Sequence, residues 1–215
     1  MLAFIIRRLI QSVVVMFFVA LLAFAMFRFV GDPVHQMVGI ETSLQEREAL
    51  RVKLGLRDPI HLQFARFVGN AATGNFGISY QHQRPVFDMI KERMPATLEL
   101  SLVSALFSLV VGIPMGVYTG LHRHGWLSKV FMTTSLIGIS LPTFLIGILL
   151  IYVFAVILGW LPSFGRGVVV DIGGWRTGLL TVEGLKALIM PAITLGLFQL
   201  TLIMRLVRAE MLEVL

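Results

Sequence analysis

The sequence predicts an all-α fold, a polytopic bundle of membrane-spanning helices with a partly helical extracytoplasmic segment. Of the 215 residues, 57% are hydrophobic and 14% are charged, a balance that excludes an ordinary water-soluble domain. Four apolar stretches have about the roughly 20 residues that a helix needs to cross a bilayer. Among the 18 basic and 12 acidic residues, only Arg28, Glu99 and Lys186 lie in these stretches, each near an end. The expected spans are residues 9–30, 97–120, 130–158 and 186–204.

Two other structures could produce apolar stretches, and both fit the sequence poorly. Strands of a membrane barrel run about 10 residues with alternating polarity, and no such alternation occurs here. Buried helices of a soluble protein would need more polar covering than 215 residues supply. A cleaved signal peptide is also disfavoured, because the first apolar run covers 22 residues whereas signal peptides carry about 7 to 15. We therefore expect residues 9–30 to be a retained helix.

Basic residues in the short flanks of the spans predict the orientation, because such residues favour the cytoplasmic side. Three flanks that share one side of a four-span topology carry Arg7 and Arg8, Arg123 and Lys129, and Arg205 and Arg208. We therefore expect a cytoplasmic N-terminus, an extracytoplasmic cap over residues 31–96 and an outer loop over residues 159–185. Trp160 and Trp175 in that loop suit the aromatic belt at a membrane surface.

The cap carries signals for three short helices. Ser43 and Glu46 form a capping-box pattern that starts a helix through Lys53. Asp58-Pro59 predicts a second start, with Asp58 as N-cap, and a third helix runs from Pro85 to Pro95. The second helix has an apolar face that we expect to lie on the membrane or on a partner subunit; it comprises Ile60, Phe64, Phe67, Val68 and Ala71. The cap as a whole is either a substrate-related structure or a surface loop with stabilising helices.

Small hydroxyl residues form stripes on two of the spans. They are Thr97, Ser101, Ser104 and Ser108 on the second span, and Thr133 and Ser140 on the third. Spacings of three, four and seven place the members of each set on one helix face. Such stripes either pack helices closely or line a polar translocation path. The sequence leaves both alternatives open, and these six residues are the candidate path-lining groups.

Prolines interrupt three consecutive spans, at Pro114, Pro142 and Pro191. Proline removes an intrahelical hydrogen bond and bends the helix. Packed membrane helices also tolerate proline, but three interruptions favour a bundle whose helices rearrange.

Several kinds of site are missing from the sequence. No ionisable residue lies at mid-span, where ion-coupled carriers place theirs. No phosphate-binding loop occurs, so any energy from ATP must come from another chain. His122 and His124 lack further metal ligands, no cysteine is present, and no catalytic constellation is found. We therefore expect no enzyme activity, cofactor or metal. The net charge of +6 is attributed to topology and anionic lipid rather than to nucleic acid.

A series of short strings resembles one family of membrane proteins, the B-type permease subunits of dipeptide and oligopeptide ABC importers, which include nickel and glutathione importers. The resemblance covers the whole chain. The strings are Gly31-Asp32-Pro33, Leu54-Gly55-Leu56, Phe76-Gly77-Ile78-Ser79, residues 93–100, Gly112-Ile113-Pro114, Gly138-Ile139-Ser140, residues 159–162 and residues 211–215.

This resemblance implies a six-span permease in the bacterial cytoplasmic membrane that works by alternating access. Residues 1–215 would be the N-terminal part of one transmembrane domain, with four of the six spans, ending before the loop that forms the coupling helix. The implied partners are a second homologous permease, two cytoplasmic ATPase subunits and an extracytoplasmic solute-binding protein. Two alternatives stay open, an ion-coupled secondary carrier and a non-transporting assembly subunit. The sequence does not specify the solute.

Overall fold

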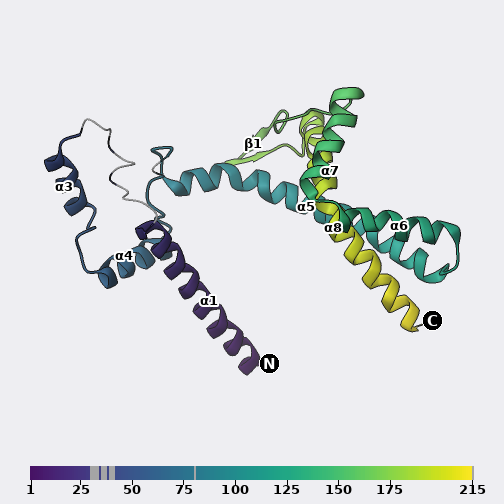
Figure 1. Cartoon of the computed structure of the whole chain (residues 1–215), viewed down its shortest axis with the longest axis horizontal. Helices are drawn as coiled ribbons and strands as arrows, with labels where there is room; N and C mark the ends of the chain where they lie inside the picture. Colours follow the sequence, from purple (N-terminus) through teal and green to yellow (C-terminus); the bar gives the residue numbers. More distant parts are fainter. Residues whose placement is uncertain (30–33, 35–37, 39–41, 80, 215) are drawn as a thin grey trace. The chain divides into compact units, whose positions relative to one another are not determined.

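A computed structural model of the chain describes residues 1–29, 34, 38, 42–79 and 81–214 (Figure 1). The Gly31-Asp32-Pro33 string lies outside the described residues. The chain divides into two compact units, Met1–Lys91 and Glu92–Leu215. The described regular structure is almost entirely helical, which confirms the expected all-α class. Among the described residues, three helices are long and apolar enough to cross a membrane, and a bent helix pair makes a fourth if it counts as one span.

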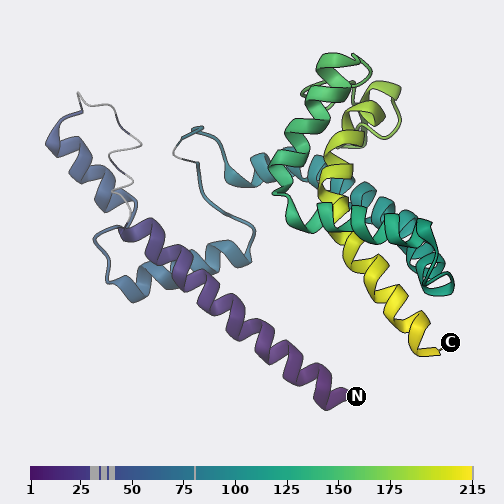
Figure 2. The same cartoon turned by 45° about the vertical axis from the view of Figure 1, so that its right-hand side comes forward.

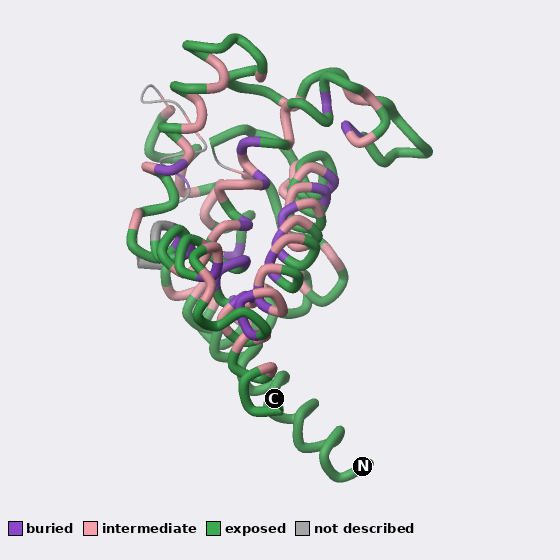
Figure 3. Tube along the Cα trace, turned by 90° about the vertical axis from the view of Figure 1, so that its right-hand side faces the viewer, coloured by how far each residue is buried: buried purple, intermediate pink, exposed green. Residues whose placement is uncertain are grey.

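The first unit contains a long apolar helix and two short helices. Helix α1 covers Leu2–Phe29, and its N-terminal part is exposed throughout (Figure 3). Helix α3 covers Leu44–Lys53 and begins with the predicted capping box. The Ser43 hydroxyl accepts from the Glu46 N–H at 3.3 Å, and the Ser43 N–H donates to Glu46 Oε2 at 3.1 Å. Gly55 then turns the chain with a φ of 66°, a conformation that glycine adopts without strain.

Helix α4, Ile60–Ala72, differs from the prediction at its start and in its partner. Its N-cap is Pro59 rather than Asp58, whose carboxylate instead binds Arg66 at 2.6 Å. Its apolar face packs against α1 of the same chain, with the Phe64 ring 5.6 Å from Phe17 and 5.5 Å from Phe24. Phe64 thus has a partner within the chain, and the expected contact of this face with the membrane or a partner subunit stays a prediction. Aromatic rings attract one another edge to face, so α1 covers the aromatic part of this face, while Ile60 and Val68 remain exposed.

Helix α5 covers Val86–Leu121, 36 residues that begin in the first unit and continue into the second. The prediction of a separate helix ending at Pro95 is wrong, because Pro95 lies inside this continuous helix. Proline removes a single backbone hydrogen bond. In so long a helix the turns on both sides hold the structure across that gap.

The third predicted span is divided. Helix α6, Trp126–Ser140, is followed by α7, Thr143–Leu150, after a bend of 108° at Leu141-Pro142. The chain then continues as a π-helical segment, η1, over Ile151–Ile157, and the Leu158 N–H bonds to the Val153 carbonyl at 3.0 Å. Pro142 is the N-cap of α7 and breaks the span, whereas Pro114 and Pro191 remain inside continuous helices.

Helix α8, Val182–Val214, is the element around which the second unit is arranged. Helices α6 and α7 both pack against it, as Figures 1 and 2 show. Before it lies an antiparallel hairpin of β1, Val170–Ile172, and β2, Trp175–Thr177. The turn is Gly173-Gly174, with φ of 61° and 89°, the positive values that a tight two-residue hairpin turn requires. This hairpin was not predicted from the sequence, although two adjacent glycines between a β-branched and an aromatic residue are a known hairpin signal.

Candidate functional site

A stripe of small residues on α5 faces α8 in the second unit. Its members are buried and recur every four residues: Ser104, Ser108, Gly112, Gly116 and Gly120. A spacing of four keeps them on one side of the helix. The predicted hydroxyl stripe therefore continues along the helix as a glycine stripe.

The glycines are required by the closeness of the two helices. A Cβ atom at Gly116 would lie 2.7 Å from Cβ of Val207 and 2.8 Å from the Met204 carbonyl oxygen. On the facing helix, a Cβ at Gly196 would lie 3.1 Å from the Ser108 hydroxyl. Small residues at such an interface let two membrane helices approach until their backbones touch. The α5–α8 pair is thus the tightly packed centre of this unit.

Helix α6 joins α8 by the same principle. The Thr201 hydroxyl of α8 donates to the Ser135 carbonyl at 2.9 Å. A Cβ at Gly138 would lie 2.9 Å from the Leu197 carbonyl oxygen. Thr201 is 1% exposed, so the rest of the chain shields this polar contact from solvent.

The six candidate path residues fall into two groups. Ser104 and Ser108 are buried at 5% and 0% exposure, and the Ser108 hydroxyl donates to the Gly196 carbonyl of α8 at 2.9 Å. This supports the packing alternative for the pair. The other four are exposed in this chain: Thr97, Ser101, Thr133 and Ser140. The path-lining role of all six stays a prediction.

Glu99 is the centre of a polar cluster at the start of the second predicted span. Its side chain is only 4% exposed, although it lies in a long apolar helix. Its carboxylate accepts hydrogen bonds from Trp175 Nε1 at 3.1 Å and from the Gly178 N–H at 3.2 Å, and it pairs with Arg166 Nη2 at 3.3 Å. A buried carboxylate is tolerated where charged and N–H donors surround it.

From the sequence alone, Glu99 was only a charge near a span end. The interfacial position of Trp175 stays a prediction, and the structure adds a specific partner for its indole N–H, the Glu99 carboxylate. One signal was available: an acidic residue inside an apolar span is expensive and implies a partner. The sequence does not identify that partner, because 67 residues separate Arg166 from Glu99.

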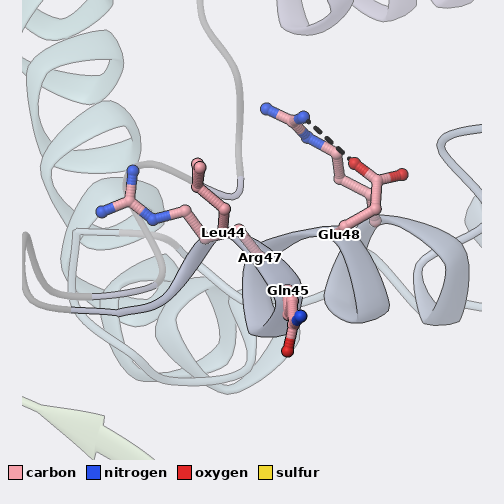
Figure 4. A pocket seen from close by; sticks show the side chains of 5 residues that line it. Leu44, Gln45, Arg47 and Glu48 are labelled. Carbon is pink, nitrogen blue, oxygen red and sulfur yellow. Dashed lines mark hydrogen bonds and ion pairs between the residues drawn. The ribbon is translucent and has the colours of Figure 1, made fainter.

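The described residues form neither a metal site nor a pocket suited to a ligand. Among the described residues, no three His, Cys, Asp or Glu side chains lie together in a way that could hold a metal ion. A hollow in the first unit is lined by side chains of α3 alone, where Arg51 pairs with Glu48 at 3.4 Å (Figure 4). A ligand needs convergent groups on several sides, and one short helix does not supply them.

The long apolar helices and their packing therefore define a polytopic membrane helix bundle. Comparisons with known proteins identify its family. Residues 1–101 match the N-terminal model of binding-protein-dependent transport system membrane components. Residues 112–215 match the binding-protein-dependent transport system inner membrane component. The chain belongs to this family and is a multi-pass inner-membrane protein.

Curated relatives match along the whole chain. A protein of Brucella abortus (strain 2308), named as a peptide transport system permease, is 37% identical over 216 residues. The glutathione transport system permease protein GsiC of Escherichia coli (strain K12) is 34% identical over 216 residues. Both alignments cover 100% of this chain, but they cover 66% and 65% of the relatives. The chain thus spans slightly less than two thirds of their length, and these relatives are named as permeases rather than as enzymes.

Proposed function

We propose that this chain is part of a permease subunit of an ATP-driven importer that moves peptides or related small solutes across the cytoplasmic membrane by alternating access. The observation that carries the proposal is the match of both family models along the chain, joined by relatives named for peptide and glutathione transport. The proposed solutes follow from the names of those two relatives. An uptake experiment decides between peptides and glutathione.

The proposed assembly contains a second homologous permease, two cytoplasmic ATPases and an extracytoplasmic solute-binding protein. The family description, a component of a binding-protein-dependent transport system, supports the last of these. The sequence supports the ATPases, because its apolar spans carry no ionisable group at mid-span and no phosphate-binding loop. The basic flanks support a cytoplasmic N-terminus.

The exposed hydroxyls on α5 are suited to a polar path. Ser101 Oγ donates to the Thr97 carbonyl at 2.8 Å, within its own helix. A hydroxyl that donates in this way keeps its lone pairs, so it can still accept from an N–H group of a passing peptide. Ser104 and Ser108 would contribute less, because α8 covers them.

Uptake by the intact importer in proteoliposomes tests the function. Labelled glutathione and labelled dialanine are the probes, and we expect uptake of at least one of them with ATP but not with a non-hydrolysable analogue. Uptake driven by an ion gradient without ATP would instead establish a secondary carrier. Unchanged uptake in cells that lack the intact protein would establish a non-transporting assembly subunit.

Bulky substitutions test the path. We expect Ser101→Leu and Thr133→Leu to lower uptake while the complex still assembles, because both side chains are exposed in this chain. Ser108→Leu is the matched comparison and should lower assembly itself, because its side chain is buried against α8. Normal uptake by both exposed variants would refute the path assignment.

A further inference from the structure

The loop between the η1 segment and α8 has little that could hold it in place by itself. Its two strands have three residues each, and in them only Thr177 is buried. An isolated two-stranded hairpin is marginally stable at best in water. Something outside the hairpin must therefore fix it.

Glu99 supplies that attachment. Its carboxylate receives donors from three points of the loop: Arg166 before the hairpin, Trp175 in β2 and Gly178 just after β2. Arg166 also donates to the Arg176 carbonyl at 3.0 Å, which ties the first point to the second strand. One carboxylate on α5 therefore holds β2 at Trp175, the chain just after β2 at Gly178, and the segment before the hairpin at Arg166.

The other end of the loop is held by the first turn of α8. The Thr181 hydroxyl donates to the Val168 carbonyl and accepts from the Gly184 N–H at 3.1 Å. The loop is therefore fastened to α5 through Glu99 and to α8 through Thr181. These two helices are packed tightly through their glycines, so the loop and both helices form one block.

We propose that Glu99 is a positioning residue that fixes this loop to the α5–α8 pair, so that the loop moves with the pair when the importer changes state. The consequence for transport, a full yield of solute per ATP hydrolysed, rests on the proposed function. The attachment of the loop does not depend on the proposed function, because it rests on hydrogen bonds within this chain.

Loop mobility in the intact complex tests the attachment. Glu99→Gln keeps the size of the side chain but replaces one carboxylate oxygen with an NH₂ group. That group donates hydrogen bonds, so it cannot accept those of Arg166 or the Gly178 N–H. We expect trypsin to cleave after Arg176 at least about tenfold faster in this variant, because a hydrogen bond to a charged group is lost. Glu183→Gln is the matched control: it makes the same chemical change at an exposed residue of the same region and should leave cleavage unchanged. Unchanged cleavage in Glu99→Gln overturns the proposal.

Fluorescence provides an independent readout. With Trp126→Phe and Trp160→Phe in the background, Trp175 is the only tryptophan in the 215 residues. Glu99→Gln should then shift its emission, because the partner of the indole N–H changes, and Glu183→Gln should not. Should Glu99→Gln fail to assemble, Arg166→Gln decides with the same cleavage assay after Arg176, since the Arg166 side chain is 35% exposed and tolerates replacement better. Wild-type cleavage in that variant overturns the proposal.

Transport separates positioning from general stability. We expect Glu99→Gln to lower the amount of dialanine or glutathione imported per ATP hydrolysed by several-fold at unchanged complex yield, with Glu99→Asp, which keeps the charge, intermediate. A proportional fall of uptake, ATP hydrolysis and yield would show a purely structural role and overturn the transport part. If the wild-type complex imports neither probe, the proposed function fails while the cleavage assay still decides the attachment.

Discussion

The Ser108 hydroxyl of α5 donates to the Gly196 carbonyl of α8 at 2.9 Å, and it also lies 2.8 Å from the Ser104 carbonyl of its own helix. The bond depends on the residue type at both ends. A side chain at position 196 would press on the Ser108 hydroxyl and on the Phe107 ring, so glycine there lets the two backbones come close enough to share one hydroxyl.

Removing that hydroxyl should weaken the helix pair. We expect Ser108→Ala to lower the free energy of unfolding by roughly 0.6 to 2 kcal/mol, the range for hydrogen bonds between membrane helices. Thermal unfolding of the detergent-solubilised complex measures the change. Ser101→Ala is the control, because its hydroxyl bonds only within α5. Equal midpoints for the two variants would contradict the assignment.

Adding one carbon atom at Gly116 should have a larger effect. Its Cβ would meet the Met204 carbonyl oxygen at 2.8 Å, and backbone cannot move aside as a flexible side chain can. We expect Gly116→Ala to destabilise the complex by about 1 to 3 kcal/mol, as overpacking does. Gly147→Ala serves as control, since the nearest atom to its Cβ would be Thr194 Cγ2 at an ordinary 3.6 Å. The measurement is again the unfolding midpoint, and a Gly116→Ala midpoint as high as that of Gly147→Ala would be the contrary result.

Ser128 offers a stabilising substitution. It is 1% exposed, and its hydroxyl oxygen has no hydrogen-bond partner within the described part of the chain. A buried hydroxyl without a partner is unfavourable by about 1 to 3 kcal/mol, so Ser128→Ala should leave the unfolding midpoint unchanged or raise it. Ser135→Ala should lower it, because that hydroxyl, also buried, donates to the Met132 carbonyl at 2.9 Å. A clear loss of stability in Ser128→Ala would contradict this interpretation.

The contact between α1 and α4 predicts a local effect. Phe64 pairs edge to face with two rings, and each such pair contributes about 0.5 to 1.5 kcal/mol. Phe64→Ala should therefore speed hydrogen exchange of the α4 amides by roughly tenfold or more. Ile60→Ala on the same helix, at a side chain that is 58% exposed, should change the exchange little. Similar exchange in both variants would mean that α4 is held by something else.

The capping box of α3 predicts an effect confined to that helix. Ser43→Ala removes the acceptor for the Glu46 N–H, a loss of about 1 kcal/mol. Hydrogen exchange in the first turn of α3 should become several-fold faster. Gln45→Ala is the comparison, because this exposed position gains helix propensity and loses no cap. If the first turn exchanges at the wild-type rate in Ser43→Ala, the cap is not what starts this helix.

The helices could be anticipated where the deciding forces are local. Hydropathy alone located the apolar spans, because a helix in a bilayer must bury its backbone polar groups and show apolar side chains. The start of α3 was equally predictable, because Ser43 and Glu46 are neighbours in sequence and form the cap between themselves. Pro95 shows the limit of such local reasoning. The proline signal for a boundary is real, yet the turns on both sides keep α5 continuous.

The sequence by itself determined which segments are apolar and helical, and its hydroxyl spacing placed Ser104 and Ser108 on one face of α5 while leaving open whether that face packs or lines a path. Only the tertiary structure decided what that face meets, how sharply the chain bends at Leu141-Pro142, and that Glu99 holds a loop at points 67 to 79 residues further along the chain. The physical reason is range. Hydropathy and capping act between near neighbours, whereas a buried carboxylate is satisfied by whichever donors the folded chain brings to it.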